Sequence, residues 1–286
     1  MAQGIEQIRH RLKVVDVSYK VTKATQLVAT AKLKRIGRRI ENIKPYYSEI
    51  YDAFHQLLPR LENSFYLKNQ AIKSRKTLWV IFTSNLGLCG GFNNNINKLV
   101  LERLNLDDEI LAIGSRGATF FKGHHRNVIE EYNDFNINST YTDSQELTLN
   151  LISKYNNKKV DSIKVAYTKY INTVTFEPAV IDLLPIINRN KDSKKHNIIL
   201  ADFEPDAKTV IETAIPLYVG AIIYGALVES QVAEQASRRL AMENASKNAN
   251  DMKNNLLISY NRARQGAITQ EISEIIGGAD AQKAPD

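Results

Sequence analysis

The residues of this chain whose types and spacing could do chemistry are few, and the most suggestive of them form a glycine-rich turn, Gly87-Leu-Cys-Gly-Gly91. The turn follows an apolar run and precedes a helical pattern, which is where nucleotide-binding domains place their phosphate loops. It nevertheless lacks the Gly-Lys-Ser/Thr ending of a P-loop and does not match G-x-G-x-x-G. We therefore predict a tight strand-to-helix turn in which Cys89 packs as a small buried hydrophobe, with a phosphate cradle as the less favoured alternative.

Neither metal ligation nor nucleophilic catalysis has a recognisable set of residues. His124 and His125 are adjacent rather than spaced along one helical face, and no acidic or cysteine partner stands three or four residues away, so we interpret them as surface residues. Cys89 is the single cysteine, which excludes an intrachain disulfide and the paired thiols of a structural zinc site, and favours a reducing compartment. No serine or cysteine has an evident base nearby in the sequence. The sequence thus predicts no catalytic residue, no metal and no cofactor.

Positive charge is concentrated in the first forty residues. The formal net charge is +7, and Met1–Ile40 holds ten Lys or Arg residues against only Glu6 and Asp16. Such a bias is typical of a protein that binds nucleic acid, an anionic membrane surface or an acidic protein. A face that is merely exposed to solvent does not account for it. The basic residues surround an apolar seam and lack the interleaved aromatic residues of single-strand binders, which disfavours nucleic acid.

No run of residues reaches the roughly 18 uncharged apolar positions of a membrane-spanning helix. The nearest is Ala214–Val228, which is interrupted by Pro216, Gly220 and Gly225, and we interpret it as a buried segment. The first residues contain neither the apolar core of a signal peptide nor a serine-rich, acid-poor presequence. We therefore expect the protein to stay where it is made, or the chain to be already mature.

The first element that must position these residues is a long N-terminal helix. Apolar or small residues recur there in alternating steps of three and four, which is the 3.5-residue period of a coiled-coil seam. The seam positions are Ile5, Ile8, Leu12, Val15, Tyr19, Thr22, Gln26, Ala29, Leu33, Ile36, Ile40 and Ile43. Because a proline pushes the preceding residue out of helical geometry, Pro45 predicts that the helix ends near Lys44, about 60 Å from its start.

The C-terminal part of the chain repeats this period. Its seam positions are Met242, Ala245, Ala249, Met252, Leu256, Ser259, Ala263 and Gly266. A helix that begins near Pro216 and stops at Gly277-Gly278 would be about 60 residues, or about 90 Å, long, which one compact domain cannot cover. Small residues at the centres of both seams let two helices approach closely. The general interpretation is a slim structural coiled coil. The more specific interpretation is a thin rod that must fit inside a partner.

Between the two helices, short β-rich runs alternate with helical ones. The expected strands are Leu78–Thr83, Glu109–Gly114, Asn127–Tyr132, Ser162–Thr168 and Thr175–Pro185; the expected helices are Asn94–Leu104 and Ser144–Tyr155, and Asn190–Lys195 is an expected loop. This alternation predicts a doubly wound α/β (Rossmann-like) domain with a mainly parallel sheet, inserted between the two halves of a long antiparallel coiled coil. The expected divisions are residues 1–60, 76–207, 208–278 and a polar tail, 279–286.

Several short blocks of the sequence are distinctive. They are Val21–Ala29 with Ala31–Lys34, Gly87–Gly91, Ala112–Gly117, Tyr170–Thr173, Phe203–Asp206, Glu234–Arg238 and Tyr260–Glu271. In this order they closely resemble the gamma subunits of rotary F-type ATP synthases, over essentially the whole chain. The last block is the most specific, and the lone cysteine argues against the redox-regulated chloroplast form, so the resemblance points to a bacterial protein.

The resemblance implies a rotor rather than an enzyme. In the family, the paired terminal helices stand inside a ring of three alpha and three beta subunits, and the α/β domain sits on the epsilon subunit and the ring of c subunits. The catalytic sites belong to the beta subunits, so neither catalytic nor cofactor-binding residues are expected in this chain. The expected location is the cytoplasmic face of the bacterial inner membrane, reached only through the complex. A free-standing coiled-coil adaptor with a small-molecule-binding α/β domain is the alternative.

The resemblance also implies contact residues. Contacts with acidic loops of the alpha/beta ring correspond to Arg264, Gln265 and Thr269, and further ring contacts correspond to Thr22, Lys23 and Arg238. Contacts with epsilon and the c ring correspond to Phe203 and Glu204.

Some positions depart from the family pattern. Asn85-Leu86 stands where the family often has an acidic residue followed by a basic one, which puts an ionic role of this position in doubt. Glu243 stands where a lysine is common and reverses a local charge, so the partner surface that faces it should differ as well. Thr25 and Leu27 replace family methionines, and the tail is more polar than usual.

Overall fold

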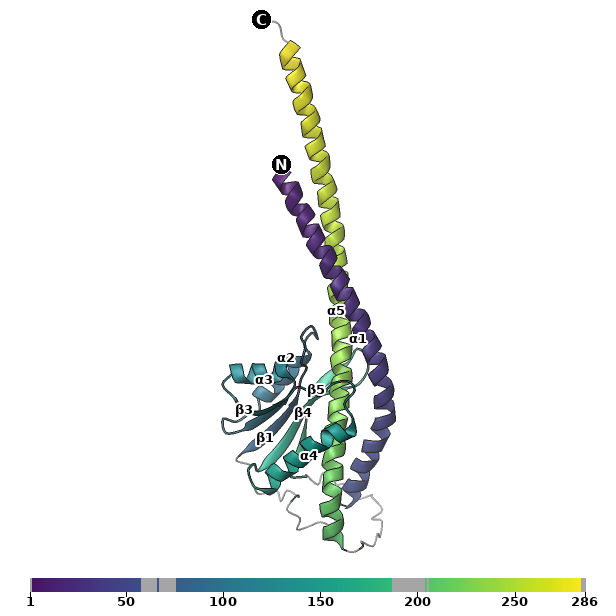
Figure 1. The fold of residues 1–286 in the computed structure, drawn as a ribbon, viewed down its shortest axis with the longest axis vertical. Helices are drawn as coiled ribbons and strands as arrows, with labels where there is room; N and C mark the ends of the chain where they lie inside the picture. The colour runs from purple at the N-terminus through teal and green to yellow at the C-terminus, as the bar shows by residue number, and fades with distance from the viewer. Residues whose placement is uncertain (1, 58–65, 67–75, 187–203, 205, 284–286) are drawn as a thin grey trace. The chain divides into compact units, whose positions relative to one another are not determined.

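The computed structural model describes residues 2–57, 66, 76–186, 204 and 206–283, in two compact units. The rod unit comprises Met1–Val28 with Arg239–Asp286, and the sheet unit comprises Ala29–Arg238. Helix α1 (Ala2–Leu57) and helix α5 (Ala207–Lys283) each contribute to both units (Figure 1). The expected loop at residues 190–195 lies outside the described residues.

In the rod unit, α1 and α5 are antiparallel and pack against each other along the predicted seam of α1. The seam side chains from Ile5 to Gln26 are half-buried, whereas Val14, Val17 and Val21 between them are exposed. Two polar contacts fix the register of the pair. They are the Ser246 hydroxyl donating to Thr22 Oγ1 at 2.9 Å and Lys253 Nζ donating to Asp16 Oδ1 at 2.6 Å. The heptad prediction for α1 is therefore confirmed.

The predicted seam of α5 is correct at five of its eight positions and wrong at the other three. Met242, Ala245, Ala249, Leu256 and Ala263 are buried or half-buried as expected. Met252, Ser259 and Gly266 are exposed, and the next residue of each takes the seam position instead: Lys253, Tyr260 and Ala267. At these three positions the seam lies one residue later than predicted, and the first of them, Lys253, reaches Asp16 in a long-range ion pair that an apolarity pattern does not contain.

Both long helices continue past their predicted ends. Helix α1 passes through Pro45, because proline removes a single intrahelical hydrogen bond and later turns are held by packing, with the Phe54 ring stacked on Tyr218 at 4.4 Å. Helix α5 passes through Pro216 and through Gly277-Gly278. Each glycine there destabilises the helix by about 1 kcal/mol relative to alanine, which is too little to end it. The helix begins at Ala207, directly after Asp206, whose carboxylate accepts from the Thr209 backbone N–H at 2.9 Å as an N-cap.

The sheet unit contains one five-stranded sheet in the order β3-β2-β1-β4-β5. The strands are β1 (Thr77–Phe82), β2 (Glu109–Ile113), β3 (Asn127–Tyr132), β4 (Ser162–Tyr170) and β5 (Phe176–Leu184). The first four of this order are mutually parallel, and β5 pairs antiparallel with β4. The connection from β4 to β5 is too short for a crossover, so only a hairpin can join them. The mainly parallel, doubly wound sheet is as predicted.

The described part of the unit also contains three shorter helices: α2 (Phe92–Leu101), α3 (Ser115–Gly123) and α4 (Tyr141–Asn156). Helix α4 begins before the predicted Ser144 because Thr140 and Asp143 form a capping box. Helix α3 is missed by the sequence pattern, since it is short and contains Gly117. That glycine is needed there, because a Cβ would lie 2.7 Å from Thr83 Oγ1.

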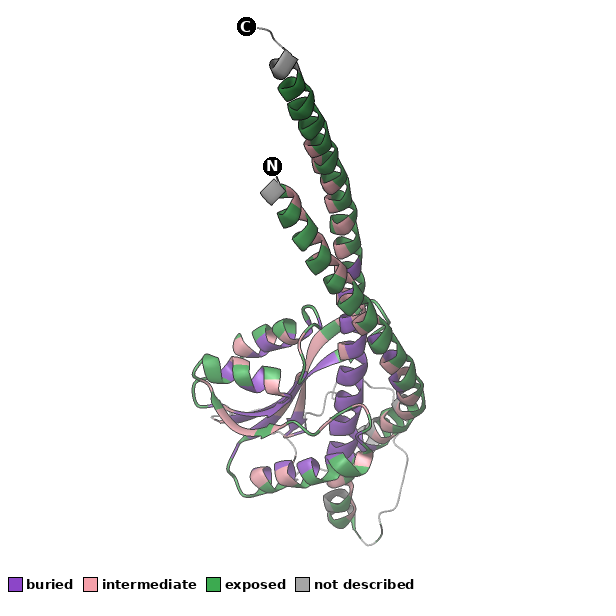
Figure 2. Ribbon diagram, turned by 45° about the horizontal axis from the view of Figure 1, so that its top comes forward, coloured by how far each residue is buried: buried purple, intermediate pink, exposed green. Residues whose placement is uncertain are grey.

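The core of the sheet unit lies on both faces of the sheet. Leu78, Val80 and Phe82 of β1 face α4 and α5, whereas Trp79 and Ile81 face α2 and α3. By length and composition alone, α5 holds an apolar window able to cross a membrane, but 78% of that window is buried inside the protein, and Figure 2 shows this part of α5 in the buried colour. The segment 214–228 is thus a core helix, as predicted.

Candidate functional site

The glycine-rich loop after β1 forms the predicted tight turn. Leu88 and Gly90 take positive φ angles of 61° and 57°, and Cys89 between them is buried. The Cys89 sulfur accepts from Asn93 Nδ2 at 3.2 Å, and Asn93 Oδ1 in turn accepts from the Ser84 backbone N–H at 2.9 Å. These contacts hold the loop from inside, and the structural interpretation of Cys89 fits them.

Helix α5 clamps this loop from the other side. Arg238 donates to the carbonyl oxygens of Leu86 and Gly87 at 3.2–3.4 Å, and the Ser237 hydroxyl donates to the Cys89 carbonyl at 2.6 Å. Arg238 also forms an ion pair with Glu234 at 2.6 Å. The clamp thus adds hydrogen-bond donors to three carbonyls of a loop that lies outside the regular hydrogen bonding of the sheet.

Arg238 therefore makes its contacts within the chain. Its residue is only 8% exposed, so the guanidinium is committed to Glu234 and the loop. Burial raises the pKa of Glu234, and Arg238 opposes that rise. Sequence comparison alone does not reveal the clamp, because its partners stand about 150 positions apart along the chain.

Asn85, where the family pattern often has a charged residue, joins three loops by neutral hydrogen bonds. Its Nδ2 donates to the Asn133 carbonyl at 2.8 Å, and its Oδ1 accepts from the Ser115 backbone N–H at 3.0 Å. The position thus ties the ends of β1 and β3 to the start of α3 without charge. Leu86 beside it is exposed.

The remaining predicted contact residues lie in the rod unit, except for Phe203 and Glu204. Thr22 is half-buried in the seam, whereas Lys23 is exposed and donates to Gln26 Oε1 at 3.2 Å. Glu243, the position of reversed charge, forms an exposed ion pair with Arg239 at 3.0 Å. Phe203 lies outside the described residues, and Glu204 is exposed.

Arg264, Gln265 and Thr269 are all exposed on α5, and the Thr269 hydroxyl donates to the Gln265 carbonyl at 3.0 Å. Around them lies an apolar stripe that the seam analysis did not identify. Its members recur at helical spacing and are exposed: Ile268, Ile272, Ile275 and Ile276. A second exposed stripe on α1 consists of Val14, Val17, Val21 and Val28. The steps of three, four and seven in both stripes are visible in the sequence, so this feature could have been found there.

Two long antiparallel helices joined by an inserted doubly wound α/β domain define a class of coiled-coil stalk proteins. A family model described as ATP synthase matches residues 4–282. The ATP synthase gamma chain of Mycoplasma capricolum is 48% identical over 261 residues, covering 91% of this chain and 92% of the relative. That of Mesoplasma florum is 45% identical over 262 residues, covering 92% of each. The chain belongs to the ATP synthase gamma-chain family.

A solved structure agrees with this assignment at the level of the fold. It is a chain of the Euglena gracilis mitochondrial ATP synthase, OSCP/F1/c-ring, in rotational state 3. At 18% identity its TM-score is 0.72, over 100% of this chain and 98% of that one. The long helix pair with its inserted domain is therefore the shared architecture.

Proposed function

We propose that this chain is the central-stalk rotor of an ATP synthase, which couples transmembrane ion flow to ATP synthesis or hydrolysis in the beta subunits by turning inside the alpha/beta ring. The observation that supports it best is the surface of the rod unit. Its helices pair through a narrow seam while valine and isoleucine stripes on their outer faces stay exposed. Such apolar stripes on a helix pair indicate a surface that a partner encloses.

The proposed contacts with the alpha/beta ring are polar side chains that are exposed on the rod unit. Arg264, Gln265 and Thr269 are exposed beside the isoleucine stripe, so they are placed to bind acidic loops, and Lys23 is exposed on α1. Thr22 is half-buried against Ser246, so its share in a ring contact would be at the edge of the seam. Arg238 would act on a partner through the exposed Leu86, whose loop it holds.

The proposed partners of the sheet unit are the epsilon subunit and the c ring. Phe203 and Glu204 are proposed contacts with the epsilon subunit and the c ring, next to the start of α5. The proposed division into residues 1–60, 76–207, 208–278 and the tail 279–286 follows these functional parts. The complex is membrane-associated, and we place this chain on the cytoplasmic face of a bacterial inner membrane, held there by its partners alone.

Co-expression with the cognate alpha and beta subunits tests the proposal. We expect this chain to co-purify in the ring, and Arg264→Ala with Gln265→Ala to weaken assembly or coupling while the helix content of the isolated chain is unchanged. Arg262→Ala is the matched control, because it is also exposed but lies about 200° around the helix from Arg264. A fully active ring that excludes the chain would overturn the proposal, as would an equal effect of the control.

A further inference from the structure

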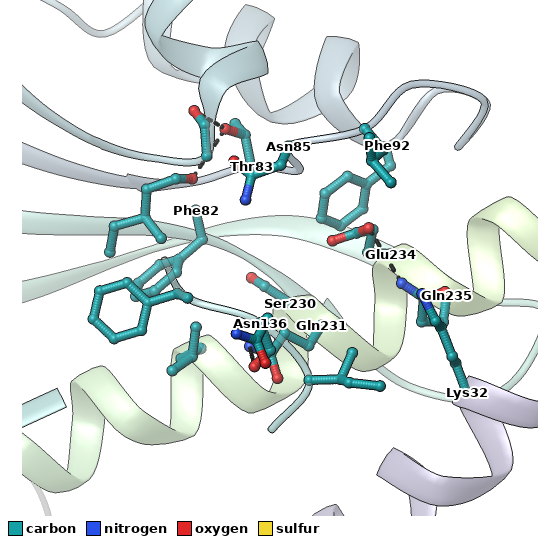
Figure 3. Close-up of a pocket in the computed structure, with 16 residues that line it drawn as sticks. Lys32, Phe82, Thr83, Asn85, Phe92, Asn136, Ser230, Gln231, Glu234 and Gln235 are labelled. Atoms are coloured by element: carbon teal, nitrogen blue, oxygen red, sulfur yellow. Dashed lines mark hydrogen bonds between the residues drawn. The ribbon is translucent and has the colours of Figure 1, made fainter. Parts of the chain in front are cut away.

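A cavity of about 170 Å³ lies in the sheet unit between α1, α5 and the loops that follow β1 and β3. Two opposite charges border it, Lys32 of α1 and Glu234 of α5. Figure 3 shows the Lys32 side chain extending from α1 toward Glu234 and Gln235. Lys32 and Glu234 are both half-buried, so water and salt screen their attraction less than on an open surface. The cavity gives these two charges room to meet.

Glu234 has one carboxylate oxygen left for a second cation. Its Oε1 accepts both from Arg238 at 2.6 Å and from Gln235 Nε2 at 3.2 Å, and neither bond uses Oε2. Arg238 in turn donates to the carbonyl oxygens of Leu86 and Gly87. A cation on Oε2 would therefore fix the carboxylate that orients Arg238 on the glycine-rich loop.

Lys32 is available to bind this oxygen. Among the residues that the structure describes, its ammonium has no ion-pair partner. Burial raises the pKa of Glu234, and the positive charge of Lys32, like that of Arg238, opposes the rise, so the two cations already act on the same carboxylate. The flexible stem of a lysine lets its ammonium move into the cavity without any change in the backbone.

We propose that Lys32 is a strap from α1 to the clamp on the glycine-rich loop, with its ammonium bound to Glu234 Oε2 across the cavity. Glu234 then holds two cations, Arg238 on one oxygen and Lys32 on the other. The strap makes the hold on the loop depend on the position of α1, because a displaced α1 withdraws Lys32 from Glu234. Lys32 is thus a positioning residue, which acts on the loop through Glu234 and Arg238.

The single thiol of the chain measures how often the loop opens. Cys89 is the only cysteine and is 2% exposed, so a thiol reagent reacts with it only when the loop has opened. The experiment uses the full chain without partner subunits, so its failure leaves the rotor function untouched. The fluorescence of the buried Trp79 shows that the sheet unit stays folded during labelling.

Removing the charge of Lys32 should speed up this reaction. We expect Lys32→Met to raise the labelling rate of Cys89 about two- to fivefold, the effect of losing a partly exposed ion pair. Lys34→Met is the matched control and should leave the rate unchanged, because Lys34 is exposed and lies about 200° around α1 from Lys32. An unchanged rate in Lys32→Met, or an equal effect of the control, would overturn the proposal.

Two more variants separate the ion pair from mere packing of the lysine stem. With Glu234→Gln in place, Lys32→Met should change the labelling rate no further, because the carboxylate that Lys32 binds is gone. Lys32→Arg keeps the charge and should keep the slow labelling of the unmodified chain. The same fold-change with and without Glu234→Gln, or a Lys32→Arg variant that is labelled as fast as Lys32→Met, contradicts the proposal.

Discussion

Replacing Arg238 by methionine tests the clamp between α5 and the glycine-rich loop. The change removes the 2.6 Å ion pair with Glu234 and the hydrogen bonds that Arg238 donates to the Leu86 and Gly87 carbonyls, of which the Leu86 carbonyl keeps the Ser84 hydroxyl as a donor. Both partners of the pair are largely buried, with side chains 9% and 18% exposed. Removing one partner of a buried pair typically costs 3–5 kcal/mol, because the other charge remains unpaired. We expect a loss of about 3–5 kcal/mol in the free energy of unfolding.

The assay follows the sheet unit specifically. Trp79 is the single tryptophan and is buried between the sheet and the α2–α3 layer, so its fluorescence reports unfolding of this unit. With a slope of about 2.5 kcal/mol per molar urea, the loss shifts the midpoint by about 1–2 M. Arg239→Met is the matched control, because its ion pair with Glu243 is far more exposed and is worth below about 1 kcal/mol.

Two further results would refute the reasoning. One is an Arg238→Met variant that loses no more stability than the Arg239→Met control. The other is a double variant, Arg238→Met with Glu234→Gln, in which the two losses simply add, because removing the buried charge should restore part of the stability.

The same clamp predicts a pH dependence. Burial raises the pKa of Glu234 above its ordinary 4.5, and Arg238 limits that rise. A carboxyl group with a raised pKa in the folded state stabilises the fold below its unfolded pKa and loses this effect as the pH rises through the folded one. Without Arg238 the pKa of Glu234 rises further. The deficit of Arg238→Met should therefore shrink as the pH falls from 7 toward 4.5, in urea titrations at each pH.

Two other perturbations have clear expected outcomes. Gly114→Ala places a Cβ 2.3 Å from a backbone oxygen at a φ of 101°, so it should lower the free energy of unfolding by about 2–4 kcal/mol. Gly37 is a helical residue of α1 where an added Cβ meets no neighbouring atom, so Gly37→Ala should raise the free energy of unfolding by about 1 kcal/mol. Thermal unfolding measures both changes. The pKa of Asp16 is lowered to about 2 by hydrogen bonds from Lys20 and Lys253. Its contribution to rod pairing is present above pH 3.8 and lost as the pH falls toward 2, and Asp16→Asn should abolish this change in helical circular dichroism.

The elements that local patterns determine were predictable. The seam of α1 follows a heptad of apolar and small residues, and β1 is a continuous apolar run buried on both faces. The antiparallel hairpin of β5 could also have been deduced, since the link after Tyr170 is too short for a crossover.

The features that depend on distant contacts were not predictable. The seam position of Lys253 in α5 involves an ion pair with the distant Asp16, and the passage of α1 through Pro45 depends on packing such as that of Phe54. The clamp of Arg238 joins segments about 150 residues apart. A sequence resemblance assigns Arg238 to a functional block, but only the fold distinguishes a side chain that binds its own loop from one that is free to bind a partner.

The way the rod shares its apolar residues between two faces explains why its seam is thin. A helix has a limited number of apolar positions, and here they are shared between an inward row and the outward valine and isoleucine stripes. The seam centre is left with Thr22, Gln26 and Ala249, which bury little apolar area and so contribute little to pairing. Half-buried polar contacts such as Asp16–Lys253 then set the register of the pair. The helix pair is therefore specified by its own residues but completed by whatever covers its outer face, which is the property that a shaft enclosed by a ring requires.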